Sequence, residues 1–233
     1  MKVFLAGATG VIGRRLVVQL RKAGHEVVGT TRSETKAAAL QALGATAAVV
    51  DAYDAQKLKL AVYAAQPDVI IHQLTDLPQE LDPDHMAAAR AANARLRIEG
   101  TRNLVDAALA SGVRRIVAQS IAFAYAPGDG PLTEDHPLDP SQAGVIALEQ
   151  AVTQTPGIDG IVLRYGRLYG PGTWTDIAKG SGPLHVDAAA QAALLVVTHG
   201  EPGIYNVAED DGAVSSEKAK RELGFDAAFR MAE

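Results

Sequence analysis

Three glycines near the start of the chain are the residues whose types and spacing best suit chemistry. Gly7, Gly10 and Gly13 follow the apolar run at residues 3–6 and lead into residues 11–20, whose apolar positions have helical spacing. A glycine turn between a buried strand and a helix exposes backbone N–H groups where the helix dipole favours an anion. In this order, glycines allow a tight turn, close approach of a diphosphate, and tight packing of helix on strand. The pattern, G-x-x-G-x-x-G, predicts a dinucleotide-binding loop, with contacts from Gly7, Thr9, Gly10, Val11, Ile12 and Gly13.

The residues after the second expected strand bear on the choice of cofactor. A site that prefers NAD usually places a carboxylate about 20 residues past the glycines, where it binds the ribose 2′-hydroxyl. Here the strand at residues 26–30 is followed by Thr31 and Arg32, with no acid. A guanidinium suits a phosphate because it donates two parallel hydrogen bonds. The segment therefore favours NADP(H), with NAD(H) as the alternative. The competing interpretation of Arg32 is a solvated charge at the entrance of a helix.

The elements that must position these residues alternate along the chain. Short apolar runs predict strands, and the stretches between them predict helices. Such alternation is typical of right-handed βαβ units, and it predicts a Rossmann-like, doubly wound α/β fold with a parallel sheet covered on both faces. Strands are expected near residues 3–6, 26–30, 47–50, 69–74, 115–120, 158–164 and 203–207. Helices are expected near residues 11–23, 33–43, 52–65, 83–110, 144–153, 186–198 and 215–223.

Length and composition limit the class of protein. The 233 residues, 48% of them hydrophobic, suffice for one sizeable domain. We expect a dinucleotide-binding domain over residues 1–165 and a small C-terminal substrate region over residues 166–233 packed on the same domain. The net charge of −5 argues against nucleic-acid partners, and no apolar run is long enough to span a membrane. The chain has no cysteine, which excludes disulfides and fits a cytoplasmic location. A homodimer is compatible with this composition.

Further motifs make the chain similar to the short-chain dehydrogenase/reductases. The glycine loop matches the phosphate loop of the extended or atypical branch, which contains NAD(P)-dependent sugar epimerases and dehydratases. Asp51 resembles an acidic residue that contacts adenine, and residues 68–74 resemble the fourth-strand motif. Residues 100–104 resemble the following helix, residues 164–172 the loop that passes the nicotinamide, and residues 185–187 a motif before the C-terminal region. The resemblance implies cofactor contacts from Thr31, Arg32, Asp51, Leu74, Thr75, Ser120, Tyr165 and Gly166.

The catalytic pattern of that family is incomplete here. The family uses a tyrosine as general acid or base, a lysine one helical turn later that lowers its pKa, and a serine or threonine that orients the substrate. Taking Glu149 as the family's helix glutamate puts Ser141 at the tyrosine position and Val145 at the lysine position. Ser120 falls one residue before Ile121, which stands at the serine position. The usual tyrosine–lysine pair is therefore absent.

Other side chains are the remaining candidates for acid–base work. We assign Tyr165 and Ser120 as the catalytic candidates, with Tyr125, Glu149 and His185 behind them; for each, ordinary packing or solvation is the competing interpretation. A literal Tyr-x-x-x-Lys occurs at residues 53–57, on the adenine side of the expected fold, and is interpreted as a chance match. The histidines show no metal-ligand spacing, so no metal is expected.

Two functions follow from these patterns. The first is an NADP(H)-dependent oxidoreductase or epimerase that acts on a small carbonyl or hydroxyl substrate with non-standard catalytic residues. The short region after Gly172 favours a small substrate over a nucleotide sugar. The second is a non-catalytic NADP(H)-binding redox sensor or regulatory protein, which the missing tyrosine–lysine pair favours. A fold alone does not choose between them.

Overall fold

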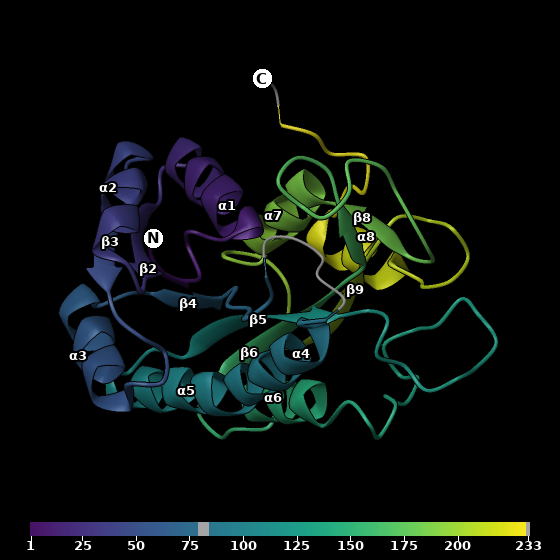
Figure 1. Ribbon diagram of the computed structural model, residues 1–233, viewed down its shortest axis with the longest axis horizontal. Coiled ribbons are helices and arrows are strands. Elements are labelled where there is room, and N and C mark those ends of the chain that lie inside the picture. Colours follow the sequence, from purple (N-terminus) through teal and green to yellow (C-terminus); the bar gives the residue numbers. More distant parts are fainter. Residues whose placement is uncertain (79–83, 232–233) are drawn as a thin grey trace.

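A seven-stranded parallel sheet lies at the centre of the protein, in the order β3-β2-β1-β4-β5-β6-β9 (Figure 1). The computed structural model describes residues 1–78 and 84–231. The strands of this sheet are β1 (Lys2–Ala6), β2 (Glu26–Thr31), β3 (Thr46–Val49), β4 (Val69–His72), β5 (Arg115–Ile121), β6 (Asp159–Tyr165) and β9 (Gly203–Val207). Each neighbouring pair is parallel. The predicted Rossmann-like doubly wound fold is confirmed.

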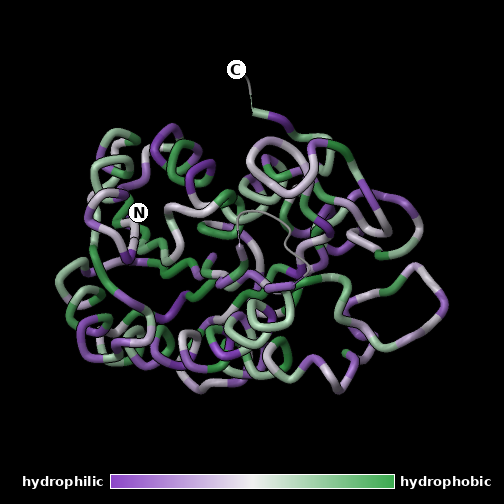
Figure 2. Tube along the Cα trace, viewed as in Figure 1, coloured by the Kyte–Doolittle hydropathy of each residue, from purple (hydrophilic) through white to green (hydrophobic). Residues whose placement is uncertain are grey.

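Helices cover both faces of the sheet (Figure 1). One face carries α1 (Val11–Lys22), α2 (Glu34–Ala42), α7 (Val186–Leu195) and α8 (Glu217–Leu223), which share a buried apolar cluster. The other face carries α3 (Ala55–Ala65), α4 (Met86–Arg95), η1 (Leu96–Gly100), α5 (Thr101–Ala110) and α6 (Ala143–Thr153). Hydropathy follows this layering, since the apolar segments concentrate along the strands between the helical layers (Figure 2). Burial on both faces explains the continuous apolar runs of the inner strands.

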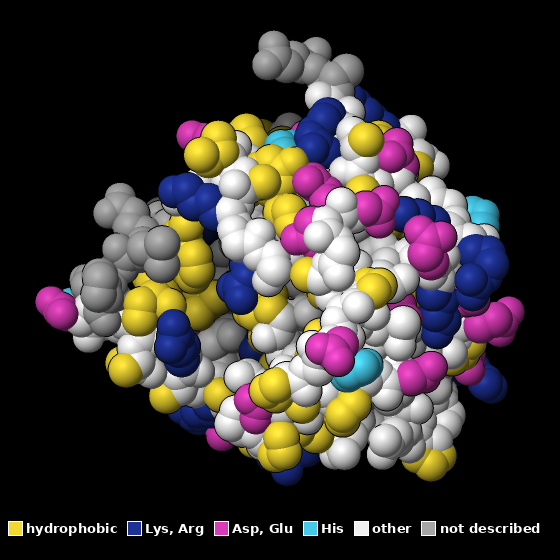
Figure 3. Space-filling model, turned by 90° about the vertical axis from the view of Figure 1, so that its right-hand side faces the viewer, with side chains coloured by type: hydrophobic (Ala, Val, Ile, Leu, Met, Phe, Trp, Pro, Cys, Tyr) yellow, Lys and Arg dark blue, Asp and Glu magenta, His cyan; other side chains and the backbone are white. Residues whose placement is uncertain are grey.

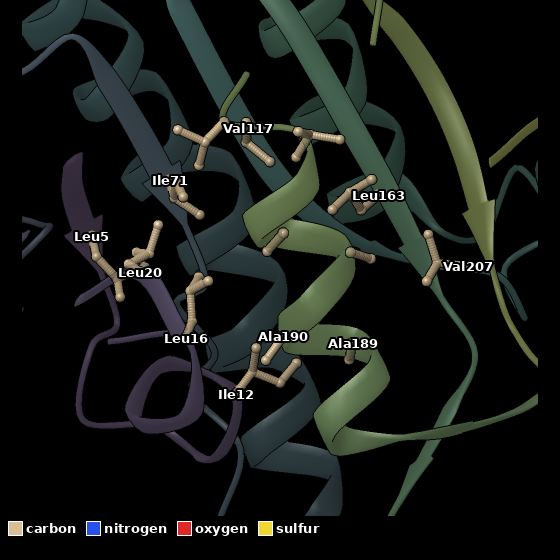
Figure 4. Packing of buried hydrophobic residues seen from close by; sticks show 14 of the residues in the cluster. Leu5, Ile12, Leu16, Leu20, Ile71, Val117, Leu163, Ala189, Ala190 and Val207 are labelled. Carbon is tan, nitrogen blue, oxygen red and sulfur yellow. The ribbon is translucent and has the colours of Figure 1, made fainter. Parts of the chain in front are cut away.

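The C-terminal region shares the core of the N-terminal one. Helix α7 packs against α1 and the sheet, and its Ala190 lies next to Ile12 of α1 (Figure 4). Small side chains allow this close approach, and β9 extends the sheet beyond β6. Arg15 on α1 adds a polar link, because its Nε donates to Asp187 Oδ1 over 2.7 Å.

The structure differs from the predicted elements in two places. The single helix expected over residues 83–110 is divided into α4, the π-helical turn η1 and α5; its expected start at Pro83 lies outside the described residues. Periodicity does not reveal a π turn, which changes the repeat over only a few residues. The glycine–proline segment at residues 165–172, expected as a loop, contains β7 (Arg167–Tyr169), which pairs in parallel with β8 (Pro183–His185). Strands of three residues are too short to give an alternating pattern.

Candidate functional site

The sheet reverses its winding between β1 and β4. From β1 the chain proceeds outward to β2 and β3, and from β4 it proceeds outward to β5 and β6. Connections that leave the carboxyl ends of two neighbouring strands in opposite directions open a crevice, and ligands of such sheets bind there. Gly7 follows β1 and Gln73 follows β4 at this point, and the Gln73 N–H donates to the Ala6 carbonyl over 2.8 Å.

The structure explains the three glycines of the loop in different ways. Gly7 has φ of +88°, and a Cβ there would lie 2.6 Å from the Gln73 carbonyl oxygen. A Cβ at Gly13 would collide with the Gly7 carbonyl oxygen, so α1 needs glycine there to pack on the loop. Gly10 is exposed with φ of −71°, and its Cβ would meet only the Gly7 oxygen at 3.3 Å. Contacts among the described residues therefore require glycine less strictly at residue 10 than at residues 7 and 13.

The amino end of α1 fits a diphosphate. No side chain caps this end of the helix, and its first turn has no acidic residue. Among the described residues, the N–H groups of Val11, Ile12 and Gly13 have no backbone or side-chain acceptor, whereas those of Gly10 and Arg14 do. Free amides at a helix amino end, beside a glycine that leaves room for close approach, suit phosphate oxygens.

The adenosine side of the crevice lies at the ends of β2 and β3. Thr31 is buried, and its hydroxyl accepts a hydrogen bond from the Ser33 N–H at 3.2 Å. Arg32 is 62% exposed and its guanidinium lies 3.4 Å from Asp76 Oδ1. Asp51 is exposed after β3, and its Oδ1 accepts from the Tyr53 N–H over 3.0 Å. The structure therefore brings the predicted adenosine-side residues to one edge of the sheet.

The other side of the crevice is built from the ends of β4 and β6. Tyr165 is 1% exposed, and its hydroxyl accepts from Gln73 Nε2 at 3.2 Å. Burial raises the pKa of Tyr165. Gln73 Oε1 is also buried and has no partner among the described residues. Leu74 and Thr75 follow on the surface side of this pair. Sequence reasoning did not select Gln73, although a polar residue directly after an apolar strand was an available signal.

Next to Tyr165, the backbone turns sharply at Gly166. A Cβ there would collide with the Gly182 carbonyl oxygen, and the Gly166 N–H donates to the Val207 carbonyl over 2.9 Å. The close contact of the predicted cofactor residue Gly166 with Gly182, just before β8, thus explains why glycine is needed there. Its relation to a bound nicotinamide remains a prediction.

A buried ion pair joins the predicted catalytic residue Ser120 to α6 and β6. Glu149 receives hydrogen bonds from Ser120 Oγ at 2.6 Å and from Arg164 Nε and Nη2 at 2.9 and 2.7 Å. Arg164 Nη1 also donates to the Tyr125 hydroxyl over 2.8 Å, and that hydroxyl donates to Asn206 Oδ1 over 2.6 Å. Burial raises the pKa of Tyr125. The side chains of Ser120, Glu149 and Tyr125 therefore all form hydrogen bonds inside the protein.

The positions of the missing tyrosine and lysine are occupied differently. Ser141 is exposed just before α6, and its N–H donates to Asp139 Oδ1. Val145 is 1% exposed in the first turns of α6. His185 packs edge-on against the Tyr169 ring with centroids 5.1 Å apart, and burial is the main cause that lowers its pKa. At residues 53–57, Tyr53 Oη donates to the Ala92 carbonyl of α4, and Lys57 Nζ lies 3.1 Å from Asp54 Oδ2.

Comparison with known proteins decides the family. The family model described as NAD dependent epimerase/dehydratase matches residues 3–181. The chain belongs to this family. A Streptomyces protein named 3-diazoavenalumate denitrifying reductase is 41% identical over 246 residues, which cover 93% of this chain and 79% of that relative. The predicted resemblance is confirmed, and so is a site of the NAD(P)-binding type, without a choice between NAD and NADP.

Solved structures of the family agree on the fold. The UDP-glucose 4-epimerase of Thermotoga maritima, solved with UDP-glucose, superposes with a TM-score of 0.80 at 16% identity, covering 99% of this chain and 94% of that one. The dTDP-glucose 4,6-dehydratase DesIV of Streptomyces venezuelae, solved with NAD and TYD, gives a TM-score of 0.79 at 20% identity, with 99% and 93% covered. At these identities the likeness establishes the fold alone.

A metal site or a membrane span would need features that the described part of the chain does not show. Within residues 1–78 and 84–231, no three His, Cys, Asp or Glu side chains are grouped as metal ligands. The helices described there are all too short or too polar to cross a bilayer. Basic and acidic side chains are interspersed over the face shown in Figure 3.

His72, the last residue of β4, makes stability depend on pH. The Leu74 N–H donates to Nδ1, and Nε2 lies 3.1 Å from Thr101 Oγ1, so the imidazole is held neutral. Burial, followed by the charge of Arg97, lowers the pKa of His72 from 6.5 to about 4. The unfolded chain binds this proton below pH 6.5 but the folded one only near pH 4. The contribution is therefore complete above pH 6.5 and is lost as pH falls to 4, by up to about 3 kcal/mol.

We expect His72→Asn to remove this dependence while its amide oxygen still accepts from Leu74. The measurement is urea unfolding of both proteins at pH 7 and pH 5, with the difference between them isolating His72 from the carboxylates. Equal losses of unfolding free energy in the two proteins would contradict the assignment.

Proposed function

We propose that this protein is an NADPH-dependent reductase that removes dinitrogen from a small aryl diazo carboxylate. The observation that carries the proposal is a dinucleotide crevice whose expected acid–base positions hold Ser141 and Val145. The Streptomyces relative supports it, because its printed name describes a denitrifying reductase of a diazo compound. The proposal thus narrows the substrate class of the predicted oxidoreductase to compounds whose reduction needs a hydride but no acidic group from the protein.

The protein's own residues fit such a reaction. A bound nicotinamide would supply a hydride, and an aryl diazonium cation plus hydride is equivalent overall to the arene plus dinitrogen, two neutral products. Because these charges balance, the overall reaction takes up no proton. Val145 is a buried apolar residue where a lysine would otherwise stand, so this position supplies no proton, and Tyr165 keeps its proton because burial raises its pKa. Reduction of a carbonyl, by contrast, requires a proton on the oxygen.

The test is NADPH oxidation by the purified protein with a diazotised aminohydroxycinnamate. We expect saturable oxidation of NADPH and release of one dinitrogen for each NADPH oxidised. Tyr165→Phe should keep most of this turnover, unlike the ~100-fold loss typical when a general acid is removed. Faster turnover of carbonyls or nucleotide sugars by the wild type would overturn the substrate class.

A non-catalytic redox sensor is the second candidate, favoured by the same absence of a tyrosine–lysine pair. It predicts saturable binding of NADPH, with no oxidation across diazo compounds, carbonyls and nucleotide sugars. The same assays therefore separate the two functions.

The preference for NADPH rests on Arg32. Its guanidinium is exposed just after β2, and Asp76, its partner among the described residues, is 3.4 Å away, so the cation could also bind a 2′-phosphate. We expect Arg32→Ala to weaken NADPH binding by about tenfold to a hundredfold, the cost of a lost hydrogen bond to a charged group, and to leave NADH unchanged. Calorimetry with both nucleotides measures this, and exposed Lys36 of α2 provides the control variant Lys36→Ala. Equal losses for both nucleotides would refute the assignment.

A further inference from the structure

Arg97 is an unusual cation within the described chain. It lies in the π-helical turn η1 and is only partly accessible. Among the described residues it is the one lysine or arginine below the exposed class that has no hydrogen bond or ion pair. A partly desolvated guanidinium without an acceptor is costly, and such groups are normally paired. Burial is also the main cause that lowers its pKa.

The neighbours of Arg97 on the same helix place it over the end of β4. Four residues earlier, Asn93 Oδ1 accepts from the Asp76 N–H at 2.9 Å. Four residues later, Thr101 Oγ1 lies 3.1 Å from His72 Nε2. Residues four apart lie on one face of a helix. Arg97 therefore lies between two contacts that bracket residues 73–75, which include the predicted cofactor residues Leu74 and Thr75.

Helix α6 approaches from the other side. A Cβ at Gly144 would lie only 3.0 Å from Ala94 Cα, so glycine allows α6 to pack closely on α4. Val145 is the next residue, and it occupies the position where the family has lysine. The charge of Arg97 reaches both Glu149 on α6 and His72 on β4. Glu149 already pairs with Arg164. Within the described part of the chain, Arg97 therefore forms no ion pair of its own, and its positive charge lies near the crevice.

We propose that Arg97 binds the carboxylate of the substrate and so fixes the aryl group in the crevice. The two oxygens of a carboxylate match the planar fork of a guanidinium. They would supply the hydrogen-bond acceptors that Arg97 lacks among the described residues. The proposal rests on the proposed reductase function and specifies its substrate as an anion. The diphosphate has its own site at the amino end of α1, on the opposite face of the sheet from η1.

The test is calorimetric binding of 4-hydroxycinnamate, an unreactive aryl carboxylate, and of its methyl ester, in the presence of NADP⁺. We expect Arg97→Met to weaken binding of the acid by about tenfold to a hundredfold and Arg97→Lys by less, with the ester unaffected. Arg90→Met, an exposed position on α4, should behave as wild type. Thermal melting shows whether each variant is folded, and NADPH affinity should be equal in all.

The outcomes separate this inference from the reductase function. Failure of the wild type to bind the acid at millimolar concentration, equal loss of acid and ester, or loss of NADPH affinity instead would overturn the role of Arg97. Arg97-dependent binding of the acid without any diazo reduction would sustain the inference and reject the reaction. Diazo reduction by Arg97→Met with an unchanged KM for the diazo carboxylate would sustain the reaction and reject the role of Arg97.

Discussion

Replacing Gly10 with valine is expected to lower the affinity for NADPH and NADH by at least about a hundredfold, close to 3 kcal/mol, while the protein stays folded. A side chain at this position would fill the space in front of the free amides of α1. Its Cβ would meet only the Gly7 carbonyl oxygen at 3.3 Å, so the loop can accommodate it. Calorimetry with both nucleotides, together with thermal melting, measures the two effects.

Gly13 provides the contrasting variant. A Cβ there would collide with backbone atoms of Gly7 and Ala8, so Gly13→Ala should lower the melting temperature before any question of binding arises. The pair separates glycine needed by the ligand from glycine needed by the fold. Unchanged nucleotide affinity in Gly10→Val would remove the loop from the binding site.

Much of the fold follows from local signals in the sequence. Each inner strand is a short apolar run buried on both faces, and Gly7 and Gly13 are required by contacts within one strand–turn–helix unit. Such contacts lie close along the chain, which is why the crevice and its adenosine side could be placed from residue types alone.

The catalytic side depends on contacts between distant residues, which a single sequence does not reveal. Ser120 was a candidate because it lies one residue before the position of the family's serine, but its bond to Glu149 joins residues 29 positions apart. The partner of Tyr165, Gln73, lies 92 positions away, across the sheet. The sequence did not predict a role for Arg97, because that role depends on its having no hydrogen bond or ion pair among the described residues of the folded chain. Side-chain roles of this kind need the tertiary structure.

The second large effect concerns the ion pair under the crevice. Glu149→Ala is expected to lower the free energy of unfolding by about 3–5 kcal/mol, because it leaves the buried Arg164 without its carboxylate. For a chain of this size the melting temperature should fall by about 10 °C. Ser120→Ala, which removes only the hydroxyl on Glu149, should cost about 1 kcal/mol. Denaturant unfolding and thermal melting give both values.

A double variant tests whether the charge, rather than the packing, causes the loss. In Glu149→Leu combined with Arg164→Met, neither charge remains buried, so the double variant should be more stable than Glu149→Ala despite two changes. The Tyr125 hydroxyl then loses its donor from Arg164 but keeps its bond to Asn206, which limits the recovery. A double variant less stable than Glu149→Ala would mean that side-chain packing, and not an unpaired charge, dominates at this position. The ion pair would then hold β5, β6 and α6 together mainly by its shape.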